Sequence, residues 1–303
     1  MSEHRIYQAG GHIFTLDFPK GMLSEKELET YAPFQTDSYL GNDKLFTLTL
    51  VNDAEALITD NPVTADFEDE NGRMTIFMQK NNGITIYLST VTDNECCRIQ
   101  ISEDYHRAEA WIGGNPGQRR YALDTALMLL YTFASSNHDT LLLHASAIEY
   151  LDKGYLFLGK SGTGKSTHSR LWQEYLYGTK LLNDDNPIVR IINETVYVYG
   201  SPWSGKTRCY LNRSVPVAGI VRLHQSPYNR IIPLHGLKAY ASLLPSCSCM
   251  KWEHKMAHAI HTTVSKVIER IPVYDLECLP NKEAAWLCFE KLRNNEKTCV
   301  KGV

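Results

Sequence analysis

One run of nine residues, 159–167, constrains this chain more than any other part of its sequence. It reads Gly-Lys-Ser-Gly-Thr-Gly-Lys-Ser-Thr and matches the pattern G-x-x-x-x-G-K-[ST]. Backbone N–H groups can wrap a polyphosphate only where side chains do not block the approach of the anion, which explains the glycines. The lysine supplies a cation for the phosphates, and the hydroxyl that follows supplies a ligand for Mg²⁺. The stretch is therefore predicted to be a phosphate-binding loop.

The residues on both sides of this stretch agree with that prediction. Residues 154–158 form a short apolar run typical of a buried strand, and residues 166–177 have a helical pattern that ends at Gly178. Such a helix directs the positive end of its dipole at a bound phosphate. A surface turn rich in Gly and Ser is the alternative, but it does not explain the order of strand, loop and helix. The residues expected to bind the nucleotide are Gly159, Ser161, Gly162, Thr163, Gly164, Lys165, Ser166 and Thr167.

Composition limits the classes of protein to which the chain can belong. With 303 residues, 43% apolar and 21% charged, it has room for one large or two ordinary globular domains. A net charge of −3 offers no general attraction to nucleic acid or to an anionic membrane, so neither is expected as a partner. No signal segment and no apolar run of about 20 residues is present, which predicts a cytoplasmic protein. The eight cysteines have no paired CxxC spacing, which favours reduced thiols. The oligomeric state is open, a homo-oligomer included.

The first part of the chain has the pattern of strands. Residues 73–79 and 84–88 alternate apolar and polar side chains around Asn81-Asn82-Gly83, which predicts a hairpin. Other strands are expected at 4–8, 12–17, 45–51 and 95–101. A helix over 118–135 then connects this part to the rest. We expect a β-rich N-terminal domain at 1–139 and a phosphate-loop domain at 140–303.

The second part mixes strands and helices, which predicts an α/β (α+β-like) fold with a mixed sheet. A strand at 141–148, which contains His144, leads through a turn at 152–154 into the strand before the loop. The other expected elements are strands at 181–185, 217–223 and 273–278, a hairpin over 188–199 that turns at Asn193, and helices at 237–244, 251–270 and 281–293.

Two adjacent carboxylates, Asp184 and Asp185, follow Lys165 by about twenty residues at the end of an apolar strand. At that position one of them can hold Mg²⁺, together with Ser166, and the other can accept the proton of an attacking hydroxyl. A solvated turn before Pro187 is the alternative, but it leaves the spacing from Lys165 unexplained. The sequence does not decide which aspartate is the metal ligand and which the base.

The order and spacing of His144, the loop and the aspartate pair resemble those of the HPr kinase/phosphorylase and ATP-dependent phosphoenolpyruvate carboxykinase group. The resemblance covers about residues 141–190 and implies a phosphate-loop domain of that type. It implies that Lys165 and Ser166 bind phosphate and Mg²⁺, that Asp184 and Asp185 act as metal ligand and catalytic base, and that His144 faces the phosphates. Taken alone, such a histidine is more often a hydrogen-bonded core residue than a catalytic one, and only the family-like distance of His144 from Gly159 favours the functional interpretation.

The resemblance ends beyond that region. The arginine- and glycine-rich signature that follows in HPr kinases is absent, and residues 200–208 stand in its place, so HPr is not implied as the substrate. Lys206 and Arg208 lie in this segment after a strand. They are candidates for cations that clamp a transferring phosphoryl group, with ordinary surface charge as the alternative.

A second candidate site combines Cys247 and Cys249 with His254, His258 and His261, the histidines being four and three residues apart. Such spacing puts the histidines on one face of a helix, where they could bind zinc. The CxC spacing is poor for a structural zinc site, and an amphipathic helix with polar histidines is the preferred interpretation.

These observations favour an ATP- and Mg²⁺-dependent kinase that transfers the γ-phosphoryl group to a hydroxyl. The acceptor is unknown: it can be a serine-type group in a protein, a peptide or a small molecule. One alternative is a non-catalytic nucleotide-binding regulatory module. Another is a carboxykinase-like enzyme that acts on an oxoacid. The chain length and the lack of a carboxylate-binding arginine cluster count against this second alternative.

Overall fold

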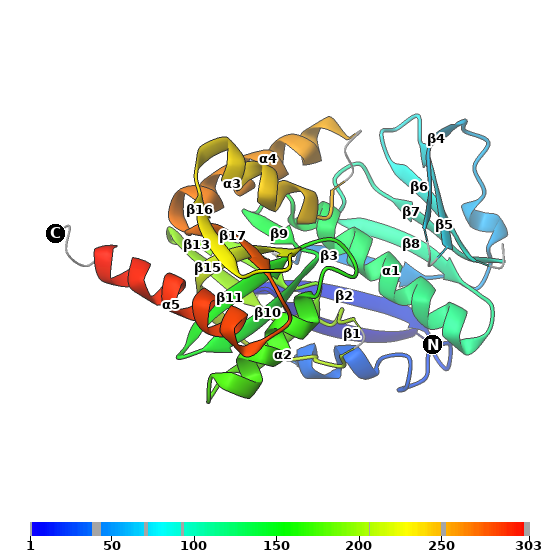
Figure 1. Cartoon of the computed structure of the whole chain (residues 1–303). Helices are drawn as coiled ribbons and strands as arrows, with labels where there is room; N and C mark the ends of the chain where they lie inside the picture. Colours follow the sequence, from blue (N-terminus) through cyan, green and yellow to red (C-terminus); the bar gives the residue numbers. More distant parts are fainter. Residues whose placement is uncertain are drawn as a thin grey trace. The chain divides into compact units, whose positions relative to one another are not determined.

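The computed structural model describes residues 2–37, 44–69, 72–91, 94–205, 207–249 and 253–299 of the chain (Figure 1). It is an α/β structure with two separate sheets. The chain divides into two compact units, Met1–Ser135 and Ser136–Val303. Within the described residues, no helix has both the length and the apolar character that a bilayer crossing requires.

The first unit is built on an eight-stranded sheet in the order β1-β2-β3-β8-β7-β6-β5-β4. The predicted hairpin is present, since β5 and β6 pair antiparallel with Thr75 opposite Tyr87. Strands β4 and β8 and the short helix η1 (Glu29–Phe34) are not anticipated by the sequence pattern. The strands are β1 (Ser2–Ala9), β2 (His12–Pro19), β3 (Phe46–Leu50), β4 (Val63–Asp69), β5 (Gly72–Met78), β6 (Ile84–Thr90), β7 (Glu95–Ile101) and β8 (Arg107–Ile112).

Helix α1 (Pro116–Ser135) belongs to this first unit and packs against β3, β7 and β8. Its start is a capping box, because Asn115 Oδ1 accepts from the Gln118 N–H while Gln118 Oε1 accepts from the Asn115 N–H. Pro116 stands at the first helical position, where its missing N–H costs nothing. The predicted helix at 118–135 is thus confirmed, two residues longer at its start.

The second unit is built on a nine-stranded mixed sheet. Its main path is β12-β10-β11-β15-β14-β13-β9, with β17 between β15 and β16. Only the β11–β15 and β15–β17 pairs of this sheet are parallel. The strands are β9 (Thr140–Leu142), β10 (Ala145–Tyr150), β11 (Lys153–Leu158), β12 (Lys180–Asp185), β13 (Ile188–Ile192), β14 (Thr195–Tyr199), β15 (Ser214–Gln225), β16 (Arg230–Leu234) and β17 (Val273–Cys278).

One prediction in this unit is wrong: the strand expected at 141–148 is two strands. β9 pairs with β13, whereas β10 pairs with β11 and β12, so the chain changes partner between them. At the break the Leu143 N–H donates to Pro187 O and the His144 N–H donates to Ser246 O. An uninterrupted apolar run conceals such a change, because every residue of the run is suited to a buried strand.

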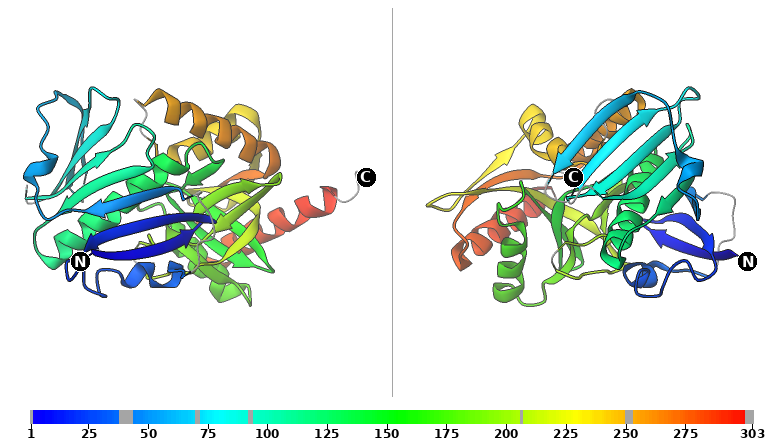
Figure 2. Two further views of the ribbon diagram at one scale, coloured as in Figure 1. Left: turned by 180° about the vertical axis from the view of Figure 1, so that it is seen from behind. Right: turned by 90° about the vertical axis from the view of Figure 1, so that its right-hand side faces the viewer.

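Helices cover both faces of the second sheet (Figures 1 and 2). α2 (Lys165–Tyr175) and α5 (Lys282–Cys299) pack together on one face, over a core that includes Trp172, Phe157 and Val221. α3 (Gly236–Leu243) and α4 (His254–Arg270) lie on the other side of the strands, and α4 packs against β9 and β14. The apolar face of α2 therefore fixes the helix that follows the loop onto the sheet.

Candidate functional site

Residues 159–164 form the loop between β11 and α2, as the pattern predicts. Gly162 and Gly164 have positive φ angles of 79° and 107°, a backbone region that side chains disfavour. A Cβ atom at either position would have no neighbour within 4 Å, so these glycines leave open space at the loop. The loop is held by a bond from Thr163 Oγ1 to Lys160 O (2.7 Å) and one from Gln225 Nε2 to Gly162 O (3.0 Å).

Lys165 is the first residue of α2, and its amino group turns back into the loop. Its Nζ atom donates to Gly159 O at 2.9 Å and to His144 Nε2 at 2.8 Å. Burial lowers the pKa of Lys165, while the carboxylates of Asp185 and Asp184 oppose that shift. The ammonium group is therefore held at the loop by Gly159 and His144, and the charges of both aspartates act on it.

His144 links the lysine to the aspartate pair. Its Nδ1 atom lies 3.1 Å from Asp185 Oδ1. Nε2 can accept from Lys165 when the ring proton is on Nδ1, facing the carboxylate, and this tautomer is assigned from the two contacts. Its side chain is 45% exposed, so it is not a core histidine. The break between β9 and β10 gives this residue its position, and the structure brings Lys165, His144 and Asp185 together in one chain of contacts.

The two aspartates close β12 and face opposite sides of the sheet. Asp184 lies opposite Ser146, whose hydroxyl is 2.6 Å from that of Ser169 on α2, so Asp184 is on the α2 face. Asp185 lies opposite Ala145 and is on the other face. Asp184 is only 6% exposed, and its Oδ1 has no hydrogen-bond partner within the described part of the chain. An unpaired buried carboxylate oxygen is costly unless a cation satisfies it.

Asn183 fixes the turn that carries both aspartates, and it is a residue that the sequence reasoning missed. It is fully buried, and its Oδ1 accepts from the N–H groups of Asp185 (3.0 Å) and Asn186 (2.8 Å). Its Nδ2 donates to Ser201 Oγ and to Trp203 O, both at 3.1 Å. An amide at the end of an apolar strand, just before the carboxylates, is the signal that could have identified it, because a buried amide requires partners.

The segment after β14 approaches the aspartates through Gly205. The Gly205 N–H donates to Asp184 O at 3.1 Å, and a Cβ atom on this residue would lie 2.7 Å from the same oxygen. Of the two predicted cations on this segment, Lys206 lies outside the described residues. Arg208 is exposed, and its role stays a prediction.

The other predicted loop ligands differ in their exposure. Ser161 and Ser166 are exposed, and Thr167 is half-buried. Mg²⁺ is usually held by one or two carboxylates, by phosphate oxygens and by water, so it does not need a closed cage of protein ligands. The unpaired Asp184 oxygen, together with a hydroxyl such as that of Ser166, fits a magnesium ion of this kind.

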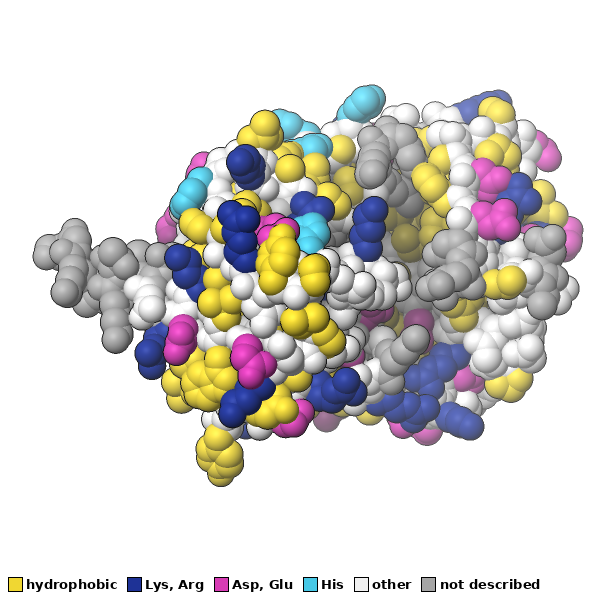
Figure 3. Space-filling view, in the orientation of Figure 1, with side chains coloured by type: hydrophobic (Ala, Val, Ile, Leu, Met, Phe, Trp, Pro, Cys, Tyr) yellow, Lys and Arg dark blue, Asp and Glu magenta, His cyan; other side chains and the backbone are white. Residues whose placement is uncertain are grey.

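The histidines proposed as an alternative metal site lie on α4. His254, His258 and His261 are exposed, and histidine side chains are visible at the edge of the surface formed by α3 and α4 (Figure 3). The His261 ring stacks on Tyr240 and bonds to its hydroxyl. No group of three His, Cys, Asp or Glu side chains among the described residues could hold a metal ion. The interpretation of α4 as an amphipathic helix with polar histidines stays a prediction.

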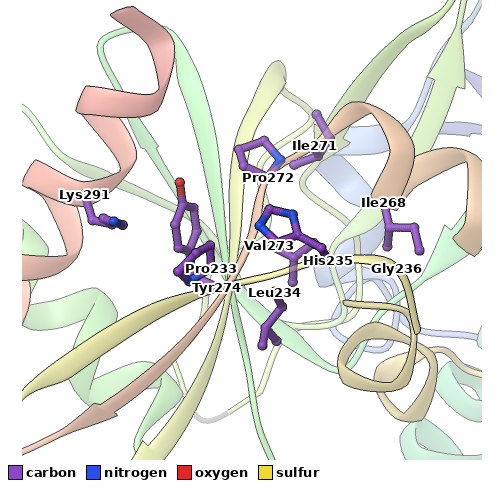
Figure 4. A pocket seen from close by; sticks show the side chains of 10 residues that line it. All are labelled: Pro233, Leu234, His235, Gly236, Ile268, Ile271, Pro272, Val273, Tyr274 and Lys291. Atoms are coloured by element: carbon purple, nitrogen blue, oxygen red, sulfur yellow. The ribbon is translucent and has the colours of Figure 1, made fainter. Parts of the chain in front are cut away.

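A cavity of about 250 Å³ lies at the beginning of β17 (Figure 4). His235, Ile268, Val273, Tyr274 and Lys291 are among the residues that line it. Because β17, β15 and β11 are parallel, the beginning of β17 is at the opposite end of these strands from the loop. The cavity is therefore separate from the cluster of Lys165, His144 and Asp185.

Comparisons with known proteins place the chain in a family. No curated protein matches it. Among solved structures, it is similar to the HPr(Ser) kinase/phosphatase from Coxiella burnetii, with a TM-score of 0.31 and 14% identity. That match covers 53% of this chain and 93% of the other. A family model described as SynChlorMet cassette protein ScmC matches residues 118–280, more than half of the chain. The chain therefore belongs to the ScmC family.

Proposed function

We propose that this protein is an ATP- and Mg²⁺-dependent phosphotransferase that moves the γ-phosphoryl group of ATP to a hydroxyl. The observation that carries the proposal is the chain of contacts from Lys165 through His144 to Asp185, at a glycine loop that is open where a polyanion would lie. A loop that only bound phosphate would need the lysine and the glycines, but not a carboxylate linked to them through an oriented imidazole.

The binding roles follow from position and charge. The loop N–H groups and the Lys165 ammonium bind the phosphates. Asp184 and Ser166 hold Mg²⁺, because the buried Asp184 Oδ1 lacks any other partner among the described residues. When bound, the metal ion neutralises charge on the phosphoryl oxygens.

Asp185 is the group that accepts the proton of the acceptor hydroxyl as the oxygen–phosphorus bond forms and ADP leaves. Its side chain is 34% exposed, so an acceptor can reach it, and the His144 Nδ1–H orients the carboxylate. His144 is a positioning residue in this scheme. Its Nε2 lone pair also keeps the Lys165 ammonium at the loop.

The proposal is tested by measuring nucleotide binding and phosphoryl transfer on the same preparation. Mg²⁺·ATP should raise the melting temperature, and γ-labelled ATP should label an acceptor in a lysate from the source cells. Lys165→Met should abolish both effects, since it removes the cation that meets the phosphates. The matched control is Lys180→Met, because Lys180 is an exposed lysine at the other end of β12.

The regulatory-module alternative gives a different outcome in the same experiment. A module would bind ATP through Lys165, but neither label transfer nor ATP hydrolysis would depend on Asp185. Binding that survives Lys165→Met would remove the loop from the proposal altogether.

A further inference from the structure

A row of directly paired residues crosses the second sheet at the end of β11, and several of them are charged and lie on the face away from α2. Along this row Asp185 lies opposite Ala145, which lies opposite Leu158. Leu158 in turn lies beside Arg222, and Arg222 beside Asp275. Directly paired residues have side chains on the same face of a sheet. Asp185 and Arg222 therefore flank, on one face, the strand that leads into the loop.

Arg222 has no partner at this position. It is half-buried, and no described residue forms a hydrogen bond or an ion pair with it. Asp275 is its direct neighbour on β17, but Asp275 Oδ1 instead contacts His224 Nε2 at 2.8 Å. A guanidinium that no described carboxylate pairs with can bind an anion from outside the chain. The arrangement fits an anion supplied from outside the chain.

The position of Arg222 relative to the loop indicates which anion. β15 reaches the loop, since Gln225, three residues after Arg222, donates to Gly162 O. The strands of Arg222 and Asp185 are three positions apart in the sheet, about 14 Å between Cα atoms at the usual strand spacing. Both side chains extend from the same face, and the arginine side chain is long. Ala145 and Leu158 between them are fully buried, so a molecule that contacts both Asp185 and Arg222 would lie along the ends of the strands, beside the loop.

We propose that Arg222 determines the specificity for the phosphoryl acceptor by binding its oxyanion, so that the acceptor is a hydroxyl compound that also carries a carboxylate or a phosphate. This inference rests on the proposed function. Arginine suits the role because its planar fork donates two parallel hydrogen bonds to either kind of oxyanion. The nucleotide phosphates already have the loop N–H groups and Lys165 as partners in the proposed function.

The test uses the full chain with Mg²⁺·ATP and three pairs of probe acceptors. The pairs are glycerate with glycerol, L-serine with L-serinamide, and glycerol phosphate with glycerol, so that each anionic compound has a counterpart without the charge. ADP formation and the phosphorylated product are measured together. We expect an anionic member of a pair to be phosphorylated and its counterpart to be inactive. Carboxylate and phosphate probes compared with each other identify which oxyanion is preferred.

Arg222→Gln should lower kcat/KM for the active anionic probe about tenfold to a hundredfold, the effect of losing a charge-assisted hydrogen-bonded pair. The ATP affinity of this variant should stay within about twofold of the wild-type value, since Arg222 does not bind the nucleotide in this proposal. Arg222→Lys keeps the positive charge but loses the planar fork, so its kcat/KM for the anionic probe should lie between those of the wild type and Arg222→Gln. Arg230→Gln, at an exposed arginine of β16, which pairs with β17 and not with β15, should leave the probe reaction unchanged.

Three results would overturn the inference. Equal reaction of the charged and uncharged members would remove the need for an anion. A tenfold loss of ATP affinity in Arg222→Gln would make Arg222 a nucleotide ligand. If the wild type binds ATP and hydrolyses it in a Lys165-dependent way while no anionic probe reacts, the acceptor class is wrong and the proposed function stands. If ATP does not bind at all, the proposed function fails first.

Discussion

At the scale of single residues, Asp184 and Asp185 are neighbours with different surroundings. Asp184 is buried on the α2 face with an unpaired oxygen, whereas Asp185 is half-exposed beside His144. We predict that Asp185→Asn lowers kcat by at least about 10², the usual lower cost of losing a general base, with little change in ATP affinity. Asp184→Asn should instead raise the Mg²⁺ concentration needed for half-maximal rate. Steady-state rates measured over a Mg²⁺ titration separate the two effects.

The same measurements can contradict the roles assigned to the two aspartates. If Asp185→Asn shifted the Mg²⁺ requirement while Asp184→Asn left it unchanged, the two roles would be exchanged. Near-normal turnover in both variants would remove the aspartates from catalysis and favour the regulatory module.

Gly205 is a second residue whose neighbourhood makes a prediction. A Cβ atom there would come within 2.7 Å of Asp184 O and 3.2 Å of Asp185 Cβ, so the end of β12 must shift to accept it. We expect Gly205→Ala to lower kcat about tenfold or more, because small displacements of catalytic groups are costly. Gly178→Ala is the control. It strains a residue with φ of 90° after α2, and it should lower the melting temperature but not the rate per folded molecule. Equal rates in wild type and Gly205→Ala would show that the aspartates tolerate the shift.

At the scale of elements, α2 contains a buried histidine, His168, whose ring packs edge-on against Phe157 of β11. His168 is 2% exposed, its Nε2 accepts from Trp172 Nε1 at 3.1 Å, and burial lowers its pKa to about 4. Between about pH 6.5 and pH 4 the unfolded chain binds a proton that the folded protein does not, so the free energy of unfolding falls as the pH falls. At pH 5 the loss from this group is about 2 kcal/mol.

Urea unfolding at pH 7 and pH 5 measures this contribution. His168→Gln retains an acceptor for Trp172 but cannot be protonated, so its loss between the two pH values should be smaller than that of the wild type by about this amount. The exposed His258→Gln is the control and should behave as the wild type. The same pH dependence in all three proteins would mean that His168 is accessible to protons in the folded state.

The pattern of the sequence predicted the elements around the loop better than it predicted the site. β11, α2 and β12 follow from apolar runs and glycines close together in the chain, and the structure has them at the expected places. The contact of His144 with Lys165 depends on a change of strand partner between Leu143 and Ala145, which is set by long-range pairing with β13 and β12. The pattern of apolar and polar residues along one segment does not show which distant strand that segment pairs with. For the same reason Gly205 and the amide-nitrogen contacts of Asn183 were not recognised, since they join residues 18 or more positions apart.

At the scale of the whole molecule, the strands β1–β8 form one sheet and β9–β17 another. The first compact unit ends at Ser135 and the second begins at Ser136, whereas the sequence suggested a boundary after residue 139. Independent folding of the two parts stays a prediction. It is supported by the fact that each unit has its own sheet and its own buried aromatic side chains, such as Phe14 in the first and Trp172 in the second.

Calorimetry of the full chain with and without Mg²⁺·ATP tests this organisation together with nucleotide binding. If the units unfold separately, two transitions should appear, and only that of the second unit, which contains the loop, should respond to the nucleotide. At a hundredfold excess over Kd the ligand adds about 2.7 kcal/mol to the stability of the unit that binds it. For a unit of this size each kcal/mol shifts Tm by about 2–4 °C, so a shift of about 5–10 °C is expected. Lys165→Met should lose the shift and keep both transitions. One transition that shifts as a whole would mean that the two units unfold as one, and a second-unit transition that ignores Mg²⁺·ATP would contradict the assignment of the loop.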